Sequence, residues 1–165
     1  MKSKLVYLER FSGAKASVYS IMEQTSSGGV SVMIDNFISN YRLEYLQEVL
    51  DIGRRLKSIG NVTGCTVNFF KEDEGLEVDD MVCALYDVPA KFLRLYCIRL
   101  NDKIVIVGNG GPKKTRTWQE DRVLSKETTA MMHASKIIRT KLANGELKIS
   151  KTQLRLDGDL YLSKS

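Results

Sequence analysis

Three short apolar runs near the middle of the chain constrain its fold more than any other feature. They are Met81–Val88, Phe92–Leu100 and Ile104–Val107, and they are rich in β-branched and aromatic residues. Each run has the length of a strand and is too short for a stable helix. A proline separates the first two runs, and Asn101-Asp102 separates the last two as in a tight hairpin. The segment predicts an antiparallel meander.

The composition changes abruptly where the third run ends. After the stretch GNGGP come Lys113, Lys114 and Arg116, with threonines among them and Trp118 at the end. Ammonium and guanidinium groups can hold phosphates, and an indole can stack on a base. We therefore predict a tight turn followed by an exposed cationic strip in which these four residues bind RNA. The alternative is an ordinary solvated loop with Trp118 as a core anchor, and composition favours neither.

Two arginines interrupt the second apolar run, which otherwise has the pattern of an interior strand. Arg94 and Arg99 fall on opposite faces of such a strand. A guanidinium there must end in a partner or in a cleft. We expect one to form an internal ion pair and the other to reach a concave surface. The sequence does not decide between them, so both remain candidates for contact with RNA.

The distribution of charge supports an anionic partner. The formal net charge is +5, but residues 61–90 contain one Lys and seven Asp or Glu. Residues 91–165 contain sixteen Lys or Arg against seven Asp or Glu. A basic C-terminal half is typical of nucleic-acid binding, although lysine excess is also common on plain surfaces.

Neither a cofactor nor a metal is predicted. GNGGPKKT is not a P-loop, because Pro112 stands where the second glycine should be and has no N–H for a phosphate. The acidic run at 72–80 lacks the spacing of a calcium loop. His133 is the only histidine and is expected to be structural. RNA can still be cleaved by its own 2′-hydroxyl if clustered cations, here residues 94, 99 and 113–116, stabilise the phosphate charge.

The remaining elements suggest three parts: a β-rich N-terminal extension (1–40), an α+β core (41–143) and a tail (144–165) with a hairpin around Asp157-Gly158. We expect strands at 4–11, 17–23 and 65–71, and a short helical piece at 37–39. A longer helix after Asn40 should bury one apolar face, and a last helix should span 126–142 after a Ser125 cap. The apolar positions expected on the longer helix are Leu43, Leu46, Val49, Leu50, Gly53 and Leu56.

The cysteines and the apolar pattern bear on location. Cys65, Cys83 and Cys97 form no C-x-x-C pair and lie in apolar runs, as buried free thiols of a reducing compartment do. No apolar run approaches the ~18 residues of a membrane helix, and no signal peptide is recognisable. We expect a cytoplasmic protein without membrane contact. Its oligomeric state is not predicted.

The order of parts over roughly residues 41–142 resembles a known family. A helix ending in Gly-Asn leads to a strand and an acidic segment, then to strands VCALYDV, FLRLYCIRL and KIVIVGN, the stretch GGPKKTRT and a final helix. This order is similar to the RelE/ParE toxin superfamily, and within it to the phage-derived host-killing proteins. The motif is Arg94 in the penultimate strand, followed by a strand that runs into Lys113-Lys114-Thr115.

The resemblance implies a RelE-like α+β fold, a twisted antiparallel sheet with packed helices, and a toxin neutralised by a partner antitoxin. Many family members are endoribonucleases that cleave mRNA in the ribosomal A site without metal, whereas the ParE branch poisons DNA gyrase. By this resemblance Arg94, Lys113 and Arg116 would be catalytic. The general acid and base are not identified, and Tyr161 in the tail is considered as a substitute. A non-catalytic interaction module with the same fold is the alternative from another class.

Overall fold

The computed structural model describes residues 2–71, 81–85, 92–113 and 121–163. The fold is α+β, with a mostly antiparallel sheet and, in the described residues, three α-helices. The strands are β1 (Lys2–Tyr7), β2 (Ser17–Gln24), β3 (Val30–Val32), β4 (Phe70–Lys71), β5 (Val82–Leu85), β6 (Leu93–Asn101), β7 (Ile104–Pro112), β8 (Leu147–Ile149) and β9 (Leu156–Gly158). The helices are α1 (Met33–Tyr41), α2 (Leu46–Ser58) and α3 (Arg122–Asn144).

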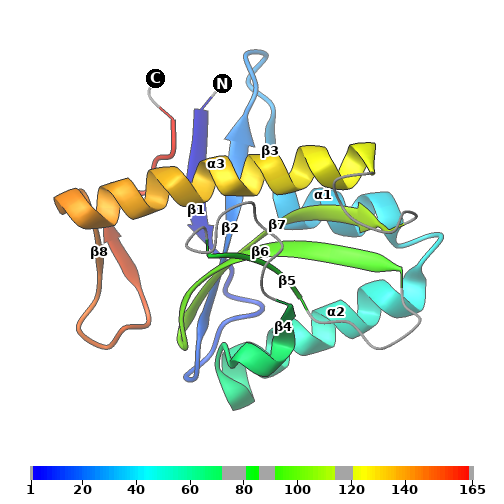
Figure 1. Cartoon of the computed structure of the whole chain (residues 1–165), viewed down its shortest axis with the longest axis horizontal. Coiled ribbons are helices and arrows are strands. Elements are labelled where there is room, and N and C mark those ends of the chain that lie inside the picture. The colour runs from blue at the N-terminus through cyan, green and yellow to red at the C-terminus, as the bar shows by residue number, and fades with distance from the viewer. Residues whose placement is uncertain (1, 72–80, 86–91, 114–120, 164–165) are drawn as a thin grey trace.

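One sheet organises the molecule. Its strand order is β1-β2-β7-β6-β5-β4, and β3 pairs with the far end of β2. The β2–β7 pair is parallel, with Val18 opposite Val105, and the other pairs in the sheet are antiparallel. Thus β2, from the expected N-terminal extension, lies inside the sheet between β1 and β7 (Figure 1). The strands β8 and β9 form a separate hairpin.

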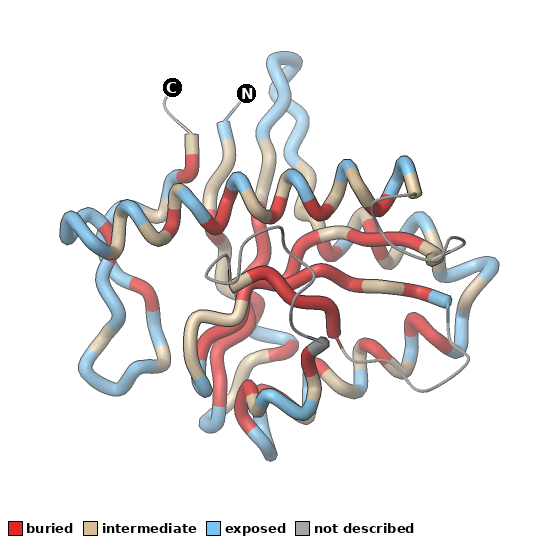
Figure 2. Tube along the Cα trace, in the orientation of Figure 1, coloured by how far each residue is buried: buried red, intermediate tan, exposed pale blue. Residues whose placement is uncertain are grey.

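Both faces of the sheet are covered, which gives two cores. Helices α1 and α2 pack on one face, where Phe37 and Leu56 are fully buried against β6 and β7. Helix α3 crosses the other face and buries Met131 and Ile138. The buried residues of Figure 2 therefore concentrate along the central strands, between the two helical layers. Burial on both sides explains why the central strands have apolar residues on both faces.

The predicted meander is confirmed as β5-β6-β7, but its last strand is longer than expected. The hairpin turn falls at Asp102-Lys103, one residue beyond the predicted turn. The stretch after Val107 is not a tight turn: β7 continues to Pro112 after a bulge opposite Tyr96. Gly110 has no Cβ, so it can pair closely with β6 at a point where a side chain would collide with the Arg94 carbonyl.

The first long helix buries only part of the predicted face, since Val49 and Leu56 are buried as expected. Helix α2 begins at Leu46 rather than directly after Asn40, and it buries Val49, Ile52, Leu56 and the carboxylate residue Glu48. The expected apolar positions Leu43, Leu46 and Leu50 are instead exposed, by 91%, 51% and 43%. The leucine spacing was therefore misleading, because a buried acidic residue takes a place on the inner face.

Four smaller expectations needed correction. Helix α1 starts at Met33, before the predicted helical piece, and α3 starts after Asp121, whose side chain accepts from the Leu124 amide, rather than after Ser125. The predicted strand at 65–71 is mostly a short 3-10 turn followed by β4. The tail does form a hairpin, but Asp157-Gly158 lies within β9 and residues 150–155 make the turn.

Other expectations are confirmed. The N-terminal runs pair as an antiparallel hairpin, with Leu5 opposite Ile21. Helix α3 ends at Gly145, which has a left-handed φ of 82°. The end of the tail lies against β1, where the Leu5 amide donates to the Leu160 carbonyl and the Leu162 amide donates to Ser3. This brings the end of the described chain beside its beginning (Figure 1).

The close β6–β7 pairing gives a stability prediction. A Cβ on Gly110 would lie 1.8 Å from the Arg94 carbonyl oxygen, so Gly110→Ala should lower the free energy of unfolding by roughly 1–3 kcal/mol. Gly53→Ala is the control, because Gly53 lies within α2 with nothing in reach of an added Cβ; it should stabilise by about 0.5–1 kcal/mol. Urea unfolding followed by circular dichroism measures both, and equal effects would contradict the pairing.

Candidate nucleic-acid interface

The ends of β6 and β7 bring two of the predicted cations together. Arg94 lies opposite Gly111, and Leu93 lies opposite Pro112. Lys113 follows directly, and its amide donates to the Phe92 carbonyl at 2.7 Å. Arg94 and Lys113 therefore leave neighbouring strands at the same end of the sheet, although they are nineteen positions apart in the chain.

Arg94 lies on the face of the sheet that α3 covers. Its neighbours Leu93 and Leu95 belong to the core under α1 and α2, whereas Tyr96 belongs to the core under α3. Because side chains alternate along a strand, Arg94 shares the α3 side with Tyr96. Arg94 is partly buried, and its Nη1 donates to the Leu93 carbonyl at 3.2 Å.

A buried carboxylate fixes the start of β6. Glu48 of α2 is only 8% exposed, and its Oε1 accepts from the amides of Phe92 at 2.6 Å and Leu93 at 3.1 Å. Hydrogen bonds from two backbone amides compensate for the burial of the acidic group. Helix α2 thus fixes the backbone immediately before Arg94. The sequence did not indicate this role, because Glu48 looks like one more acidic residue early in a helix.

The glycines at the end of β7 allow two helices to approach the strand. A Cβ on Gly111 would lie 3.0 Å from the Tyr41 hydroxyl oxygen and 3.3 Å from Cγ1 of Val123. A Cβ on Gly108 would collide with the sulfur of Met131, at 2.3 Å. The glycine-rich stretch is therefore where the end of α1 and the start of α3 converge on β7.

Two titratable groups with raised pKa values lie at this junction. The pKa of Tyr41 is raised chiefly by burial and further by the negative charges of Glu127 and Asp121. The pKa of Glu127 is also raised chiefly by burial, with Lys126 lowering it and Glu23 raising it. Neither residue stands out in the sequence, because they lie on different helices and belong to no motif.

The structure does not bring Arg99 to this place. Its Nη2 bonds to Asp102 at 2.5 Å, and its Nε donates to the Cys65 carbonyl at 2.7 Å. Arg99 is thus held by an ion pair and a backbone hydrogen bond. It lies five residues along β6 from Arg94, about 16 Å away. Its predicted contact with RNA would need a second binding region at the β6–β7 turn.

The other predicted site residues lie outside the described residues. These are Lys114, Arg116 and Trp118, and the acidic run at 72–80 also lies outside them. Lys113 is therefore the member of the predicted strip that the structure places.

The cysteines and the histidine do not contribute to this junction. Cys65, Cys83 and Cys97 are buried free thiols, as predicted. Burial raises the pKa of Cys65 to about 12 and that of Cys97 well above its ordinary value, so neither forms a thiolate near neutral pH. His133 lies on an exposed position of α3.

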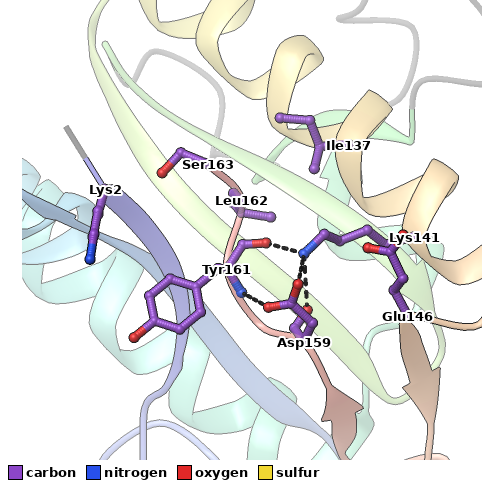
Figure 3. Close-up of a pocket in the computed structure, with 8 residues that line it drawn as sticks. All are labelled: Lys2, Ile137, Lys141, Glu146, Asp159, Tyr161, Leu162 and Ser163. Atoms are coloured by element: carbon purple, nitrogen blue, oxygen red, sulfur yellow. Dashed lines mark hydrogen bonds and ion pairs between the residues drawn. The ribbon is translucent and has the colours of Figure 1, made fainter. Parts of the chain in front are cut away.

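A separate cavity of about 930 Å³ lies between the second half of α3, β1 and the tail. Figure 3 shows Lys141 reaching across it: its Nζ donates to the Asp159 carboxylate at 2.6 Å and to the Tyr161 carbonyl at 2.5 Å. These bonds hold the tail against α3. Tyr161 lines this cavity, whereas Val123, at the opposite end of α3, lies against Gly111. The two places are therefore distinct.

Two features are absent from the described residues. Within them, no three His, Cys, Asp or Glu side chains gather as a possible metal site. None of the described helices combines the length and the apolar character needed to cross a membrane.

Comparisons of the chain with protein-family models, with curated protein sequences and with solved structures found no match.

The Glu48 bonds give a prediction about the backbone at the site. Glu48→Ala should lower the free energy of unfolding by roughly 1–3 kcal/mol, because two amides lose their acceptor. The amides of Phe92 and Leu93 should then exchange with solvent faster than in the wild type. Glu44→Ala, at an exposed position just before α2, is the control and should change neither quantity. Unchanged protection of both amides in Glu48→Ala would contradict the assigned role.

Proposed function

We propose that this chain is a toxin-like RNA-binding protein of a type II toxin–antitoxin pair that cleaves mRNA on the ribosome without a metal. The observation that carries the proposal is the pairing of β6 with β7, which brings Arg94 and Lys113 to one end of the sheet. Two cations from adjacent strands can contact one phosphodiester and stabilise charge that develops on its oxygens.

The topology supports the proposal. The order α2-β4-β5-β6-β7-α3, with the meander delivering Arg94 and then Lys113, agrees with the order of parts for which the sequence resembles the RelE/ParE superfamily. The charge distribution also agrees, since the C-terminal half has a large excess of Lys and Arg. Lys114, Arg116 and Trp118 follow Lys113 directly and would extend the contact with RNA.

A protein partner such as an antitoxin has separate support. Leu43, just before α2, and Leu46 and Leu50, in its first turns, are exposed. Phe92, whose amide donates to Glu48 of that helix, is 56% exposed. Large apolar side chains gathered on a surface favour protein–protein contact. This surface adjoins the start of β6, so a bound partner would lie near Arg94.

Expression in a bacterial host tests the proposal. The wild type should arrest growth and deplete mRNA, because it cleaves transcripts during translation. Arg94→Gln/Lys113→Gln should relieve the arrest, because the phosphate loses both cations. Lys148→Gln/Lys151→Gln removes the same charge from exposed positions of the β8–β9 hairpin and its turn, and should still arrest growth. Circular dichroism of the purified variants checks that each is folded.

Other outcomes point to the rival functions. Growth arrest with DNA damage and intact mRNA would indicate gyrase inhibition. A wild type that accumulates as folded protein, in a host without a neutralising partner, and leaves growth and mRNA unchanged would indicate a non-catalytic interaction module. Either result would overturn the mRNA endonuclease.

A further inference from the structure

Two proton-carrying side chains from different helices, Tyr41 and Glu127, lie close enough for the charge of Glu127 to act on the Tyr41 hydroxyl. Tyr41 is the last residue of α1, and its hydroxyl oxygen would lie 3.0 Å from a Cβ on Gly111. Gly111 is the direct partner of Arg94 in the β6–β7 ladder. Side chains of directly opposed residues share one face of a sheet, so the hydroxyl lies over the strand pair from which Arg94 emerges.

Helix α3 supplies the second group. Val123, Glu127 and Met131 are spaced i, i+4, i+8 and therefore share one face of the helix. Val123 lies against Gly111 and Met131 lies against Gly108, so this face of α3 runs along the end of β7. Glu127 lies between them, over the same glycine-rich strand.

Both groups are partly buried. Within the described residues, neither the Tyr41 hydroxyl nor the Glu127 carboxylate has a hydrogen-bond partner. The charges that act on Glu127 are Lys126 on its own helix and Glu23 on β2, and Glu127 in turn acts on Tyr41 of α1. Tyr41 also faces Asp121 and Tyr45.

We propose that Glu127 and Tyr41 are the general base and general acid of this site, acting on an RNA phosphodiester held by Arg94 and Lys113. This assignment rests on the proposed endonuclease function. Burial raises the pKa of the Glu127 carboxyl, so its carboxylate is a stronger base than an exposed one. Burial also raises the pKa of Tyr41, so the phenol keeps its proton at neutral pH and can donate it.

Each proton in the proposed step has a donor and an acceptor. The 2′-oxygen forms a bond to phosphorus as its proton passes to the Glu127 carboxylate. The bond between phosphorus and the 5′-oxygen breaks as that oxygen takes the Tyr41 proton. The products are a 2′,3′-cyclic phosphate and a 5′-hydroxyl. The protonated carboxyl and the phenolate that remain return to their starting states when a proton moves from Glu127 to Tyr41, directly or through water.

Single-turnover cleavage of a defined mRNA on programmed ribosomes, using the full chain over about pH 5 to 9, tests the assignment. The wild-type rate should fall as the pH falls through the raised pKa of Glu127. Glu127→Gln should slow cleavage by roughly 10²–10⁴-fold. The cleavage rate of this variant should no longer fall as the pH is lowered. Tyr41→Phe should slow cleavage of the ordinary substrate by a similar factor.

A substrate with sulfur in place of the bridging 5′-oxygen separates the two roles, because a thiolate leaves without taking a proton. It should restore Tyr41→Phe to near the wild-type rate and should not restore Glu127→Gln. Glu146→Gln is a matched control at an exposed position beyond the far end of α3, and it should cleave like the wild type. Tyr161→Phe tests the rival assignment of the acid to the tail.

The outcomes distinguish this assignment from the function on which it rests. Suppose the wild type cleaves, but the rate of Glu127→Gln still falls at low pH as the wild-type rate does. The assignment of the base is then wrong and the endonuclease proposal stands. The same holds for the acid if Tyr41→Phe is slowed equally with both substrates. If Tyr161→Phe is slowed and rescued by sulfur, the acid is in the tail and the assignment is wrong. If the wild type cleaves no mRNA on ribosomes, both proposals fail.

Discussion

The antiparallel pairing of β6 with β7 is the interaction on which the rest of the structure depends. It places a strand pair at the middle of the sheet, with α1 and α2 on one face and α3 on the other. At its far end the ladder is held so closely that Gly110 has no room for a Cβ beside the Arg94 carbonyl. The same pairing sets Arg94 beside the backbone that leads into Lys113.

Contacts from the helices also fix the start of β6 and the end of β7. The buried carboxylate of Glu48 binds the backbone amides just before Arg94, so the position of β6 depends on α2. Gly108 and Gly111 let α3 and the end of α1 come close to β7. A single end of the sheet thus holds two cations, a phenol and a carboxyl, with pKa values of the last two raised by burial. That combination is the physical basis for proposing phosphodiester chemistry here.

The sequence predicted the local features of the fold better than the long-range ones. The meander, the N-terminal hairpin, the buried thiols and the end of α3 at Gly145 follow from patterns within a few residues. The parallel β2–β7 pair joins strands more than eighty residues apart, which no local pattern reveals. The glycine-rich stretch looked like a turn because its close approach to Arg94 is a tertiary contact. For the site, the sequence pointed to Arg94 and Lys113 through their charge, but Glu48, Tyr41 and Glu127 gain their significance only from the packing of three helices.

The central claim is that RNA phosphates bind at the end of β6 and β7, and the salt dependence of RNA binding tests it most directly. The dissociation constant of a single-stranded RNA is measured over a range of salt for the wild type and for a variant without the Arg94 and Lys113 charges. Each phosphate that is no longer neutralised should reduce the slope of log K against log salt by roughly 0.7, and the two cations hold one phosphodiester, so the slope for this variant should be shallower by about 0.7. A slope identical to that of the wild type would show that the phosphates bind elsewhere, and would contradict the account.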